Sequence, residues 1–192
     1  MTTTLKPTVY GVGINDVPKS WGKPYYRVWY EMFRRSYDPK WHARKPTYIG
    51  CTVDSRWHHL SDFKRWYEEQ GDVKGKQLDK DIISPGNKVY GPDKCLLITR
   101  ELNLFFTKRD SYRGELPIGV FQRGERFVAA IGLGKHGKRW HIGSYDTPEE
   151  AHQVWLKEKR KQLYERYILP ETNERLKNAL MNVYNNMEEY FK

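Results

Sequence analysis

The chain has 192 residues, and its 34 Lys and Arg outnumber its 24 Asp and Glu, which gives a formal net charge of +10 at pH 7 and favours a nucleic-acid partner. Aromatic residues make up 15% of the sequence, so the chain is no disordered basic tail, and its length suits one or two small domains. The two cysteines, Cys51 and Cys95, are too few for a disulfide framework or a four-cysteine zinc site. No apolar run has the length of a membrane span or of a signal-peptide core. We therefore expect a cytoplasmic protein with no membrane partner.

Two helices are predicted in the first part of the chain. Apolar and aromatic residues recur at helical spacing over residues 25–37, and again over residues 61–70. The inward residues of the second helix are Phe63, Trp66 and Tyr67. Between the helices we expect a basic loop at 40–46 and a strand at 48–53. We interpret the aromatic residues as core rather than as base-stacking platforms, because they follow the helical spacing.

Carboxylates and an amide follow in the next segment. Asp79 and Asp81 lie one residue apart at the end of a predicted strand, where alternation would point both side chains to one face and toward one divalent cation. Asn87 lies in the following loop, which leads to a predicted short turn of helix. In the alternative interpretation Asp79 pairs with a lysine or caps a turn. Asn87 follows Gly86, which is typical of a turn, and Cys95 is expected to be a small buried residue.

Three strands are predicted by alternation over residues 118–123, 126–133 and 138–145. The turns between them are expected at Gly124-Glu125 and at residues 135–137. One face is predicted to carry Phe127, Ala129, Ile131, Leu133, Trp140 and Ile142. The opposite face is predicted to carry Val128, Ala130, Gly132, Arg139, His141 and Gly143. The second face combines small side chains with cations, so a nucleic-acid groove can approach it closely.

A helix is predicted directly after the strands. Thr147 is the expected N-cap, Pro148 the first-turn proline and Glu150 the capping-box glutamate. Its apolar stripe is Ala151, Val154 and Trp155, with Lys157, Lys159, Arg160 and Lys161 further along. After a break at Pro170, a C-terminal helix is expected to begin near 171–173. Its stripe of Leu176, Leu180, Val183, Tyr184, Met187 and Phe191 is predicted to pack on the body of the protein, or alternatively to form a homodimer surface.

Residues 116–162 resemble the plant ethylene-response-factor (Apetala-two) DNA-binding domain, which also occurs in phage endonucleases. The framework residues that match are Gly119-Val120, the strand 127–131, Trp140-His141-Ile142-Gly143-Ser144-Tyr145 and Thr147-Pro148-Glu149-Glu150-Ala151. The resemblance implies that the sheet enters the major groove of double-stranded DNA. Arg123 and Arg139 hold matching contact positions, and His141 stands where tryptophan is usual.

Other positions of the sheet depart from that family. Polar contact residues of that family are replaced here by Ile118, Phe121, Ala130 and Gly132. The resemblance therefore implies DNA binding in general more strongly than the recognition of particular bases. The DNA-binding residues expected in this part are Arg123, Arg126, Lys138, Arg139 and His141. The generic alternative is a sheet packed on a helix with no ligand.

The segment from 78 to 99 resembles the ββα-metal core of HNH nucleases, in the degenerate form found in phage proteins that join it to the sheet domain. Residues 26–37, 50–53, Trp57 and 63–66 are similar to the same phage family. The resemblance implies that Asp79 binds the divalent metal, Mg²⁺ or Mn²⁺, and that Asn87 is the middle asparagine. Lys80 takes the place of the histidine general base, and Lys94 that of a second metal-ligating asparagine.

Neither lysine can perform the usual role, because an ordinary lysine is protonated at pH 7 and cannot accept a proton or bind a metal. Three explanations remain. Another base acts, with His58, His59 and His42 as the candidates; Asp79 and Asp81 serve as the metal ligands; or the site has lost activity. In the last case Lys80, Lys88 and Lys94 contact DNA phosphates. Adjacent histidines without a spaced third ligand are more often structural than catalytic.

The expected fold class is α+β. It comprises a degenerate HNH-like putative nuclease region with helices at 1–106, a basic linker at 107–115, a three-stranded antiparallel sheet packed on one helix at 116–168 and an amphipathic helix at 169–192. The predicted function is a phage homing-type endonuclease that nicks or cuts duplex DNA with a divalent metal in the host cytoplasm. The alternative is a catalytically inactive DNA-binding protein, regulatory or inhibitory, on an HNH-like scaffold.

Overall fold

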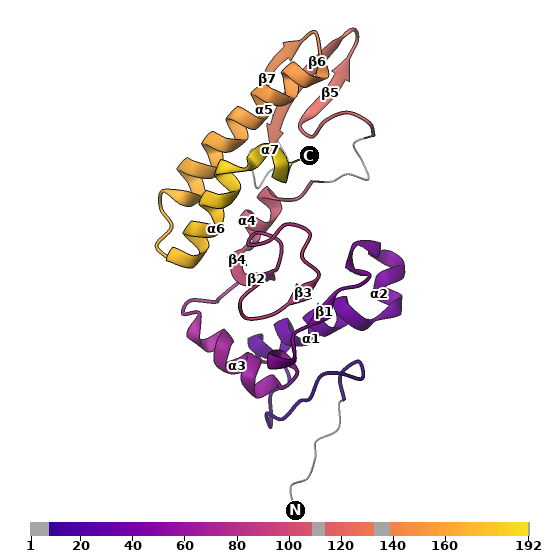
Figure 1. Cartoon of the computed structure of the whole chain (residues 1–192), viewed down its shortest axis with the longest axis vertical. Coiled ribbons are helices and arrows are strands. Elements are labelled where there is room, and N and C mark those ends of the chain that lie inside the picture. Colours follow the sequence, from indigo (N-terminus) through magenta and orange to yellow (C-terminus); the bar gives the residue numbers. More distant parts are fainter. Residues whose placement is uncertain (1–7, 109–113, 133–138, 192) are drawn as a thin grey trace, which may run out of the picture. The chain divides into compact units, whose positions relative to one another are not determined.

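The computed structural model describes residues 8–108, 114–132 and 139–191 of the chain (Figure 1). The chain divides into two compact units, Met1–Thr99 and Arg100–Lys192, which we call the N-terminal and C-terminal units. Both combine helices and strands, so the predicted α+β class is confirmed. No helix among the described residues is long and apolar enough to cross a membrane.

Two helices form the core of the N-terminal unit, as predicted. They are α1 (Pro24–Tyr37) and α3 (Leu60–Glu69). Trp29, Phe33 and Phe63 are fully buried, and the Trp29 and Phe33 ring centroids lie 4.7 Å apart. The indole Nε1 of Trp29 donates to the carbonyl of Trp57 at 2.8 Å, so the largest core residue also has its polar atom satisfied. Burial of each such ring stabilises the unit by about 1.5–3 kcal/mol.

The predicted loop at 40–46 is wrong, because most of it forms helix α2 (Pro39–Arg44). Asp38 caps this helix by accepting from the backbone N–H of Lys40 at 2.9 Å, and Pro39 provides a first residue with a helical φ. A 3-10 turn, η1 (Pro46–Tyr48), follows. The predicted strand at 48–53 is therefore reduced to β1 (Thr52–Val53).

Four short strands complete the N-terminal unit around a 3-10 turn, η2 (Ser55–Trp57). β1 pairs in parallel with β3 (Val89–Tyr90), and β2 (Lys76–Asp79) pairs in antiparallel with β4 (Leu96–Thr99). Helix α4 (Arg100–Phe105) follows β4 directly in the chain and belongs to the C-terminal unit. The order in the chain is thus β2, β3, β4 and then α4.

The C-terminal unit contains the predicted antiparallel sheet in the order β5, β6, β7 (Figure 1). Its strands are β5 (Val120–Arg123), β6 (Arg126–Gly132) and β7 (Arg139–Tyr145). Helix α5 (Pro148–Leu163) packs on it, and the Thr147 hydroxyl caps that helix by accepting from the Glu150 N–H at 3.2 Å. Sheet, cap and helix are therefore confirmed, whereas the predictions for Leu133, Lys138 and the turn at 135–137 lie outside the described residues.

The predicted assignment of side chains to the two sheet faces is wrong in part. The pairing of β6 with β7 shifts between Ala129 and Ala130, so β7 carries one extra residue, Ile142, opposite this step. A bulge of this kind interrupts the two-residue alternation. Gly143, predicted on the face of Ala130, pairs instead with Ala129, whereas Trp140 pairs with Ile131 and His141 with Ala130, as predicted. Exposure does not follow these faces, since Trp140 is 60% exposed and Val128 only 2% exposed.

The C-terminal helices pack within their own unit. A π-helical turn, η4 (Tyr164–Ile168), leads to α6 (Glu174–Asn185) and α7 (Met187–Tyr190). The predicted stripe residues Leu176, Leu180, Val183, Met187 and Phe191 are buried, and the Phe191 ring lies 5.4 Å from that of Trp155 on α5. This supports packing on the body of the protein over the homodimer alternative for this stripe.

Candidate nucleic-acid interface and candidate metal site

The sheet of the C-terminal unit has one face against α5 and one face away from it. Cross-strand partners share a face, so Val120 and Ala129 lie on one side while Phe121 and Val128 lie on the other. Ala129 is fully buried, and the α5 residues Ala151 and Trp155 are buried with it. We call the other side, with Phe121, Arg123, Arg126, Val128, Ala130, His141 and Ser144, the outer face.

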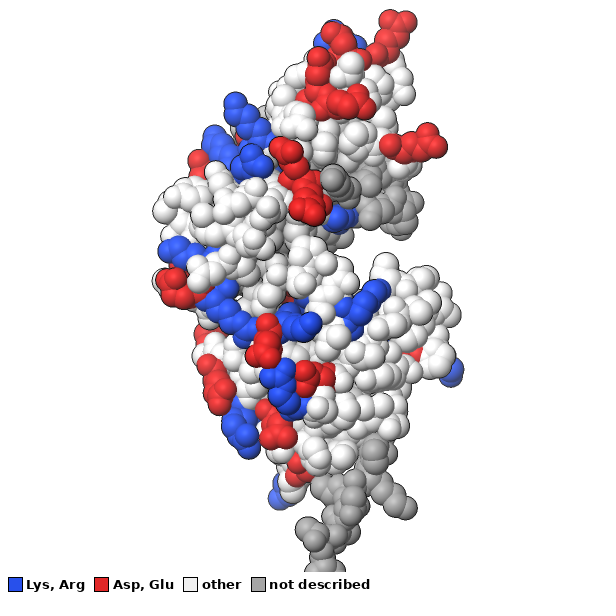
Figure 2. Space-filling view, in the orientation of Figure 1, with Lys and Arg blue, Asp and Glu red and all other residues white. Residues whose placement is uncertain are grey.

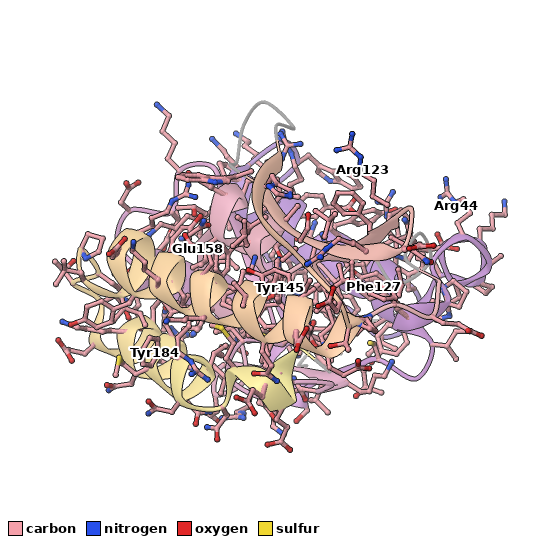
Figure 3. All side chains as sticks on the ribbon, turned by 90° about the horizontal axis from the view of Figure 1, so that it is seen from above. Arg44, Arg123, Phe127, Tyr145, Glu158 and Tyr184 are labelled. Atoms are coloured by element: carbon pink, nitrogen blue, oxygen red, sulfur yellow. The ribbon has the colours of Figure 1, made fainter. Side chains whose placement is uncertain are left out.

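Arg123 is the most available described cation of the outer face. It is exposed, and among the described residues no ion pair includes it. Figure 3 shows its side chain projecting away from α5, whereas Phe127 and Tyr145 lie on the side that faces the helix. Arg126, its cross-strand partner, is instead engaged, because its guanidinium pairs with Asp146 at 3.1 Å and donates to the Ser144 carbonyl at 2.9 Å.

The other predicted DNA-binding residues of the sheet differ in how much the structure says about them. His141 is exposed on the outer face, and its Nε2 lies 3.2 Å from the Ser144 hydroxyl. The backbone of Arg139 pairs with Gly132. The side chain of Arg139 and the whole of Lys138 lie outside the described part of the chain. The described outer face therefore offers Arg123 and His141 beside the small residue Ala130.

The opposite edge of the same unit is acidic. An open hollow of about 540 Å³ lies at the start of α5, lined by Arg126, Tyr145, Asp146, Glu149 and Glu150 together with Gln153 and Val154. Figure 2 shows acidic side chains gathered at the end of the unit that holds the strands, and basic ones along the course of α5. Three carboxylates against one arginine repel phosphate, so this hollow is unsuited to a nucleic-acid backbone.

Asp79 ends strand β2 and caps the turn that follows. Its Oδ1 accepts from the backbone N–H groups of Asp81 at 3.0 Å and Ile82 at 2.8 Å. Burial raises the pKa of Asp79 above its usual value. Because β2 stops at Asp79, Asp81 lies beyond the strand, and the expectation that strand alternation aligns both carboxylates is wrong.

Lys80 and Asn87 brace the same loop from its two ends. The Lys80 ammonium is buried, and donates to Asp81 at 2.7 Å and to the carbonyl of Asn87 at 2.6 Å. The Asn87 amide donates to the carbonyls of Lys80 at 3.1 Å and Val89 at 2.7 Å, while its oxygen accepts from the Val89 N–H at 3.0 Å. We call this arrangement the Lys80–Asn87 brace. Both side chains are structural here, and Lys80 is too enclosed to contact a phosphate.

The described residues do not form a closed site for the divalent cation that the HNH resemblance implies. No group of three His, Cys, Asp or Glu side chains comes together in the part of the chain that the structure describes. Asp79 and Asp81 each have one oxygen engaged, and the Lys80 ammonium lies against Asp81. Asn87 uses its amide oxygen for the backbone, so a cation would find few of the six to eight oxygens that hard cations favour.

The candidate histidines are held by other contacts. Nε2 of His58 lies 3.0 Å from the Val53 carbonyl, and Nε2 of His42 lies 2.8 Å from the Arg35 carbonyl. Nδ1 of His59 lies 3.2 Å from the carboxylate of Asp16. None of these contacts joins a histidine to the Lys80–Asn87 brace.

The contact between His59 and Asp16 is part of a helix cap. Asp16 accepts from the backbone N–H of Ser61 at 2.8 Å and from its hydroxyl at 2.6 Å, at the start of α3. Burial alone would raise the pKa of Asp16, but the hydrogen bonds from Ser61 and His59 lower it. The carboxylate is thus ionised to hold the helix end, and the cluster has no bond from Ser61 to His59 that would activate the hydroxyl.

Two further lysines and both cysteines complete the predicted set. Lys94 is exposed, and Lys88 is exposed but donates to the carbonyl of Thr47 at 2.7 Å. Cys51 and Cys95 are both buried, which confirms the expectation for Cys95. The sequence analysis placed the cations of residues 40–46 in a basic loop and missed helix α2, which carries Lys40 and Arg44. The signal for this helix is Asp38-Pro39, an N-cap followed by a first-turn proline.

Comparisons with known proteins assign the chain to no family. No protein-family model, curated protein or solved structure matches the chain. The functional argument therefore rests on the outer face of the sheet, on the Lys80–Asn87 brace and on the resemblances carried by the residues quoted above.

Proposed function

We propose that this chain is a duplex DNA-binding protein that meets DNA with the outer face of the β5-β6-β7 sheet. The observation that carries the proposal is Arg123, an exposed cation on the face directed away from α5 and outside the ion pairs of the described residues. Ala130 and Gly132 on the same face are small, so a groove can approach the backbone closely. The resemblance of this sheet and helix to the Apetala-two domain supports the same partner.

The proposed contacts are to phosphates more than to base edges. Phe121 and Ala130 bear no hydrogen-bonding side chain, and Gly132 bears no side chain at all, yet all three occupy outer-face positions. Base readout in the major groove needs donors and acceptors at such positions. Phosphate contacts fix the position of a protein on DNA without specifying the sequence. We therefore infer binding with low sequence selectivity and a strong dependence on salt.

We expect Arg123→Ala to weaken binding to duplex DNA about tenfold at moderate salt, because a charge-assisted contact contributes about 1.5 kcal/mol. The slope of log K against log salt should fall by about 0.9, the value for one lost phosphate contact. Fluorescence anisotropy with a labelled duplex at several salt concentrations measures both quantities.

The matched control is Lys161→Ala, which removes the same charge from an exposed position of α5. It should leave the affinity nearly unchanged, and Arg123→Lys should retain most of the salt slope. Equal losses for Arg123→Ala and Lys161→Ala would show that only net charge matters, and the outer face would then lose its special role.

The second candidate function is the metal-dependent duplex DNA endonuclease that the HNH resemblance implies. Two observations favour it. The antiparallel pair of β2 and β4 has the short strand β3 between its members in the chain and is followed by helix α4, and the half-buried carboxylate of Asp79 lies at the end of β2. The Lys80–Asn87 brace favours the non-cutting alternative, because it occupies the groups that the resemblance assigns to catalysis.

Asp79→Asn separates the two candidates. The asparagine oxygen still accepts from the N–H groups of Asp81 and Ile82, so we expect the turn to persist. Because burial raises the pKa of Asp79, its ionisation costs the folded state stability at pH values above the usual pKa of a carboxyl, and the uncharged variant should be no less stable than the wild type at pH 7. Conversion of supercoiled plasmid in Mg²⁺ or Mn²⁺ is the readout for cutting.

The main proposal expects the wild type and Asp79→Asn to bind duplex DNA equally and to leave the plasmid intact. Nicking or linearisation by the wild type that disappears in a folded Asp79→Asn protein would establish the endonuclease instead.

A further inference from the structure

A second cationic surface lies in the N-terminal unit. Residues 34–45 hold five Lys and Arg and a single carboxylate, Asp38. The carboxylate of Asp38 is turned to the N–H of Lys40 as the cap of α2. We use the name α2 surface for Arg34, Lys40, Trp41, Arg44 and Lys45. Glu31 pairs with the guanidinium of Arg34, so the unpaired positive charge of this surface comes from Lys40, Arg44 and Lys45.

The α2 surface is organised around one aromatic ring. The guanidinium of Arg34 lies 4.3 Å from the centroid of the Trp41 ring, and that of Arg44 lies 5.3 Å from it. Cations placed against an indole ring in this way are attracted by its π-electrons. The ring therefore orders guanidinium groups that would otherwise sample many rotamers, and an ordered guanidinium loses less entropy when it meets a phosphate.

The backbone beneath the surface is also fixed. The His42 ring contacts the Arg35 carbonyl at 2.8 Å, which ties α2 to α1. Lys40, Arg44 and Lys45 are all exposed, and Figure 3 shows Arg44 pointing outward from α2. The backbone of the surface is thus held in place, and the charged ends of its exposed side chains reach into solvent.

Two N–H donors of the α2 surface lack acceptors. Nε of Arg34 and Nε1 of Trp41 are shielded from solvent and have no hydrogen-bond partner among the described residues. Buried donors are ordinarily satisfied. A phosphate would reach these two donors only after the covering side chains move aside, so its first contacts would be with the exposed Lys40, Arg44 and Lys45.

We propose that the α2 surface binds phosphates of the same DNA duplex that the outer face of the sheet binds. This inference rests on the proposed function, because it assumes a duplex partner. Phosphate fits the surface better than a carboxylate-rich protein does, since guanidinium groups recognise phosphate oxygens by paired hydrogen bonds and a DNA backbone presents charges at regular spacing. The chain thereby contacts DNA with both units.

The test is the triple variant Lys40→Gln, Arg44→Gln and Lys45→Gln in the full chain, with a labelled duplex as the probe. We expect the affinity at moderate salt to fall at least tenfold, and the slope of log K against log salt to fall by about 2.7, the value for three phosphate contacts. The double variant Lys40→Gln and Lys45→Gln leaves Arg44 on the Trp41 ring. It should reduce the slope by about 1.8. This double variant replaces the triple variant in the test if the triple variant shows no thermal unfolding transition and is therefore not folded.

The control variant carries Lys23→Gln, Arg65→Gln and Lys74→Gln, which remove the same charge from exposed positions of the same unit. Its slope should stay close to that of the wild type. A folded α2-surface variant with wild-type affinity and slope, alongside a weakened Arg123→Ala protein, would overturn this inference and leave the proposed function standing. A wild type that does not bind duplex DNA would overturn both.

Discussion

Gly119→Ala is expected to destabilise the C-terminal unit by about 4 kcal/mol. Gly119 has a φ of +83°, and a Cβ at this position would lie 2.2 Å from Cδ1 and Cγ of the Trp155 ring. Trp155 cannot withdraw, because it is buried, with the His152 ring stacked on it and the Phe191 ring packed edge-on against it. The variant therefore combines a left-handed backbone with an overlap in the core of the sheet and helix. Urea denaturation of the full chain, followed by circular dichroism, measures the loss.

Gly124→Ala is the matched control for this effect. Gly124 also has a positive φ, +62°, in the turn between β5 and β6, but nothing lies within 4 Å of its added Cβ. Only the backbone cost remains, and we expect about 1 kcal/mol. If both variants lose the same stability, the contact with Trp155 is not what requires glycine at position 119.

The stability of the C-terminal unit is expected to rise with pH between about pH 7 and pH 10, because Lys159 is buried on α5. Its ammonium lies 3.5 Å from the Phe105 ring centroid and donates to the Phe105 carbonyl at 2.7 Å. Burial, together with the charge of Arg166, lowers the pKa of Lys159 to about 7. Above that pH the unfolded chain binds more protons than the folded one, so stability rises, by up to about 1.4 kcal/mol per pH unit.

Lys159→Met should remove this pH dependence and be at least as stable as the wild type at pH 7, since methionine fills a similar volume without a charge to bury. The comparison is best made between pH 7 and pH 9, because burial raises the pKa of Tyr167, and such a group lowers stability once the pH passes its unfolded value near 10. A wild type with a flat profile would show that the carbonyl and ring contacts keep Lys159 protonated at its ordinary pKa.

Periodic segments were predictable from the sequence and irregular ones were not. The spacing of Trp29 and Phe63 among apolar neighbours identified α1 and α3, because burial of one helix face leaves a repeat in the sequence. Helix α2 has no buried residues, so it leaves no such repeat. Its only local sign is the cap at Asp38-Pro39, and Asp38 is also the residue that follows the end of α1.

The sheet shows a different limit. Alternation located β5, β6 and β7, and the Thr147 cap located α5, because both signals are local. The extra residue of β7, Ile142, moves Gly143 to the face of Ala129, and only the pairing with β6 reveals it. The exposure of Trp140 and the burial of Val128 depend on what packs over each position, which alternation along a strand does not report.

The sequence located the segment that holds the candidate metal site, but it did not predict where the side chains of that segment point. Asp79, Lys80 and Asn87 do gather in one loop. Whether an amide or a carboxylate faces a ligand or its own backbone depends on the turn that the loop adopts, and residue types do not determine that choice. The turn cap that was weighed for Asp79, and the turn role weighed for Asn87, are the arrangements the structure has.

The division of the chain into two compact units carries a consequence for residence on DNA. With one phosphate-binding surface in each unit, as we propose, engagement of the first makes the second encounter intramolecular, at an effective concentration in the millimolar range. Two contacts that are weak singly then hold the protein for much longer than either does alone. Release of one unit leaves the other attached, so the protein can exchange between neighbouring stretches of duplex without dissociating into solution.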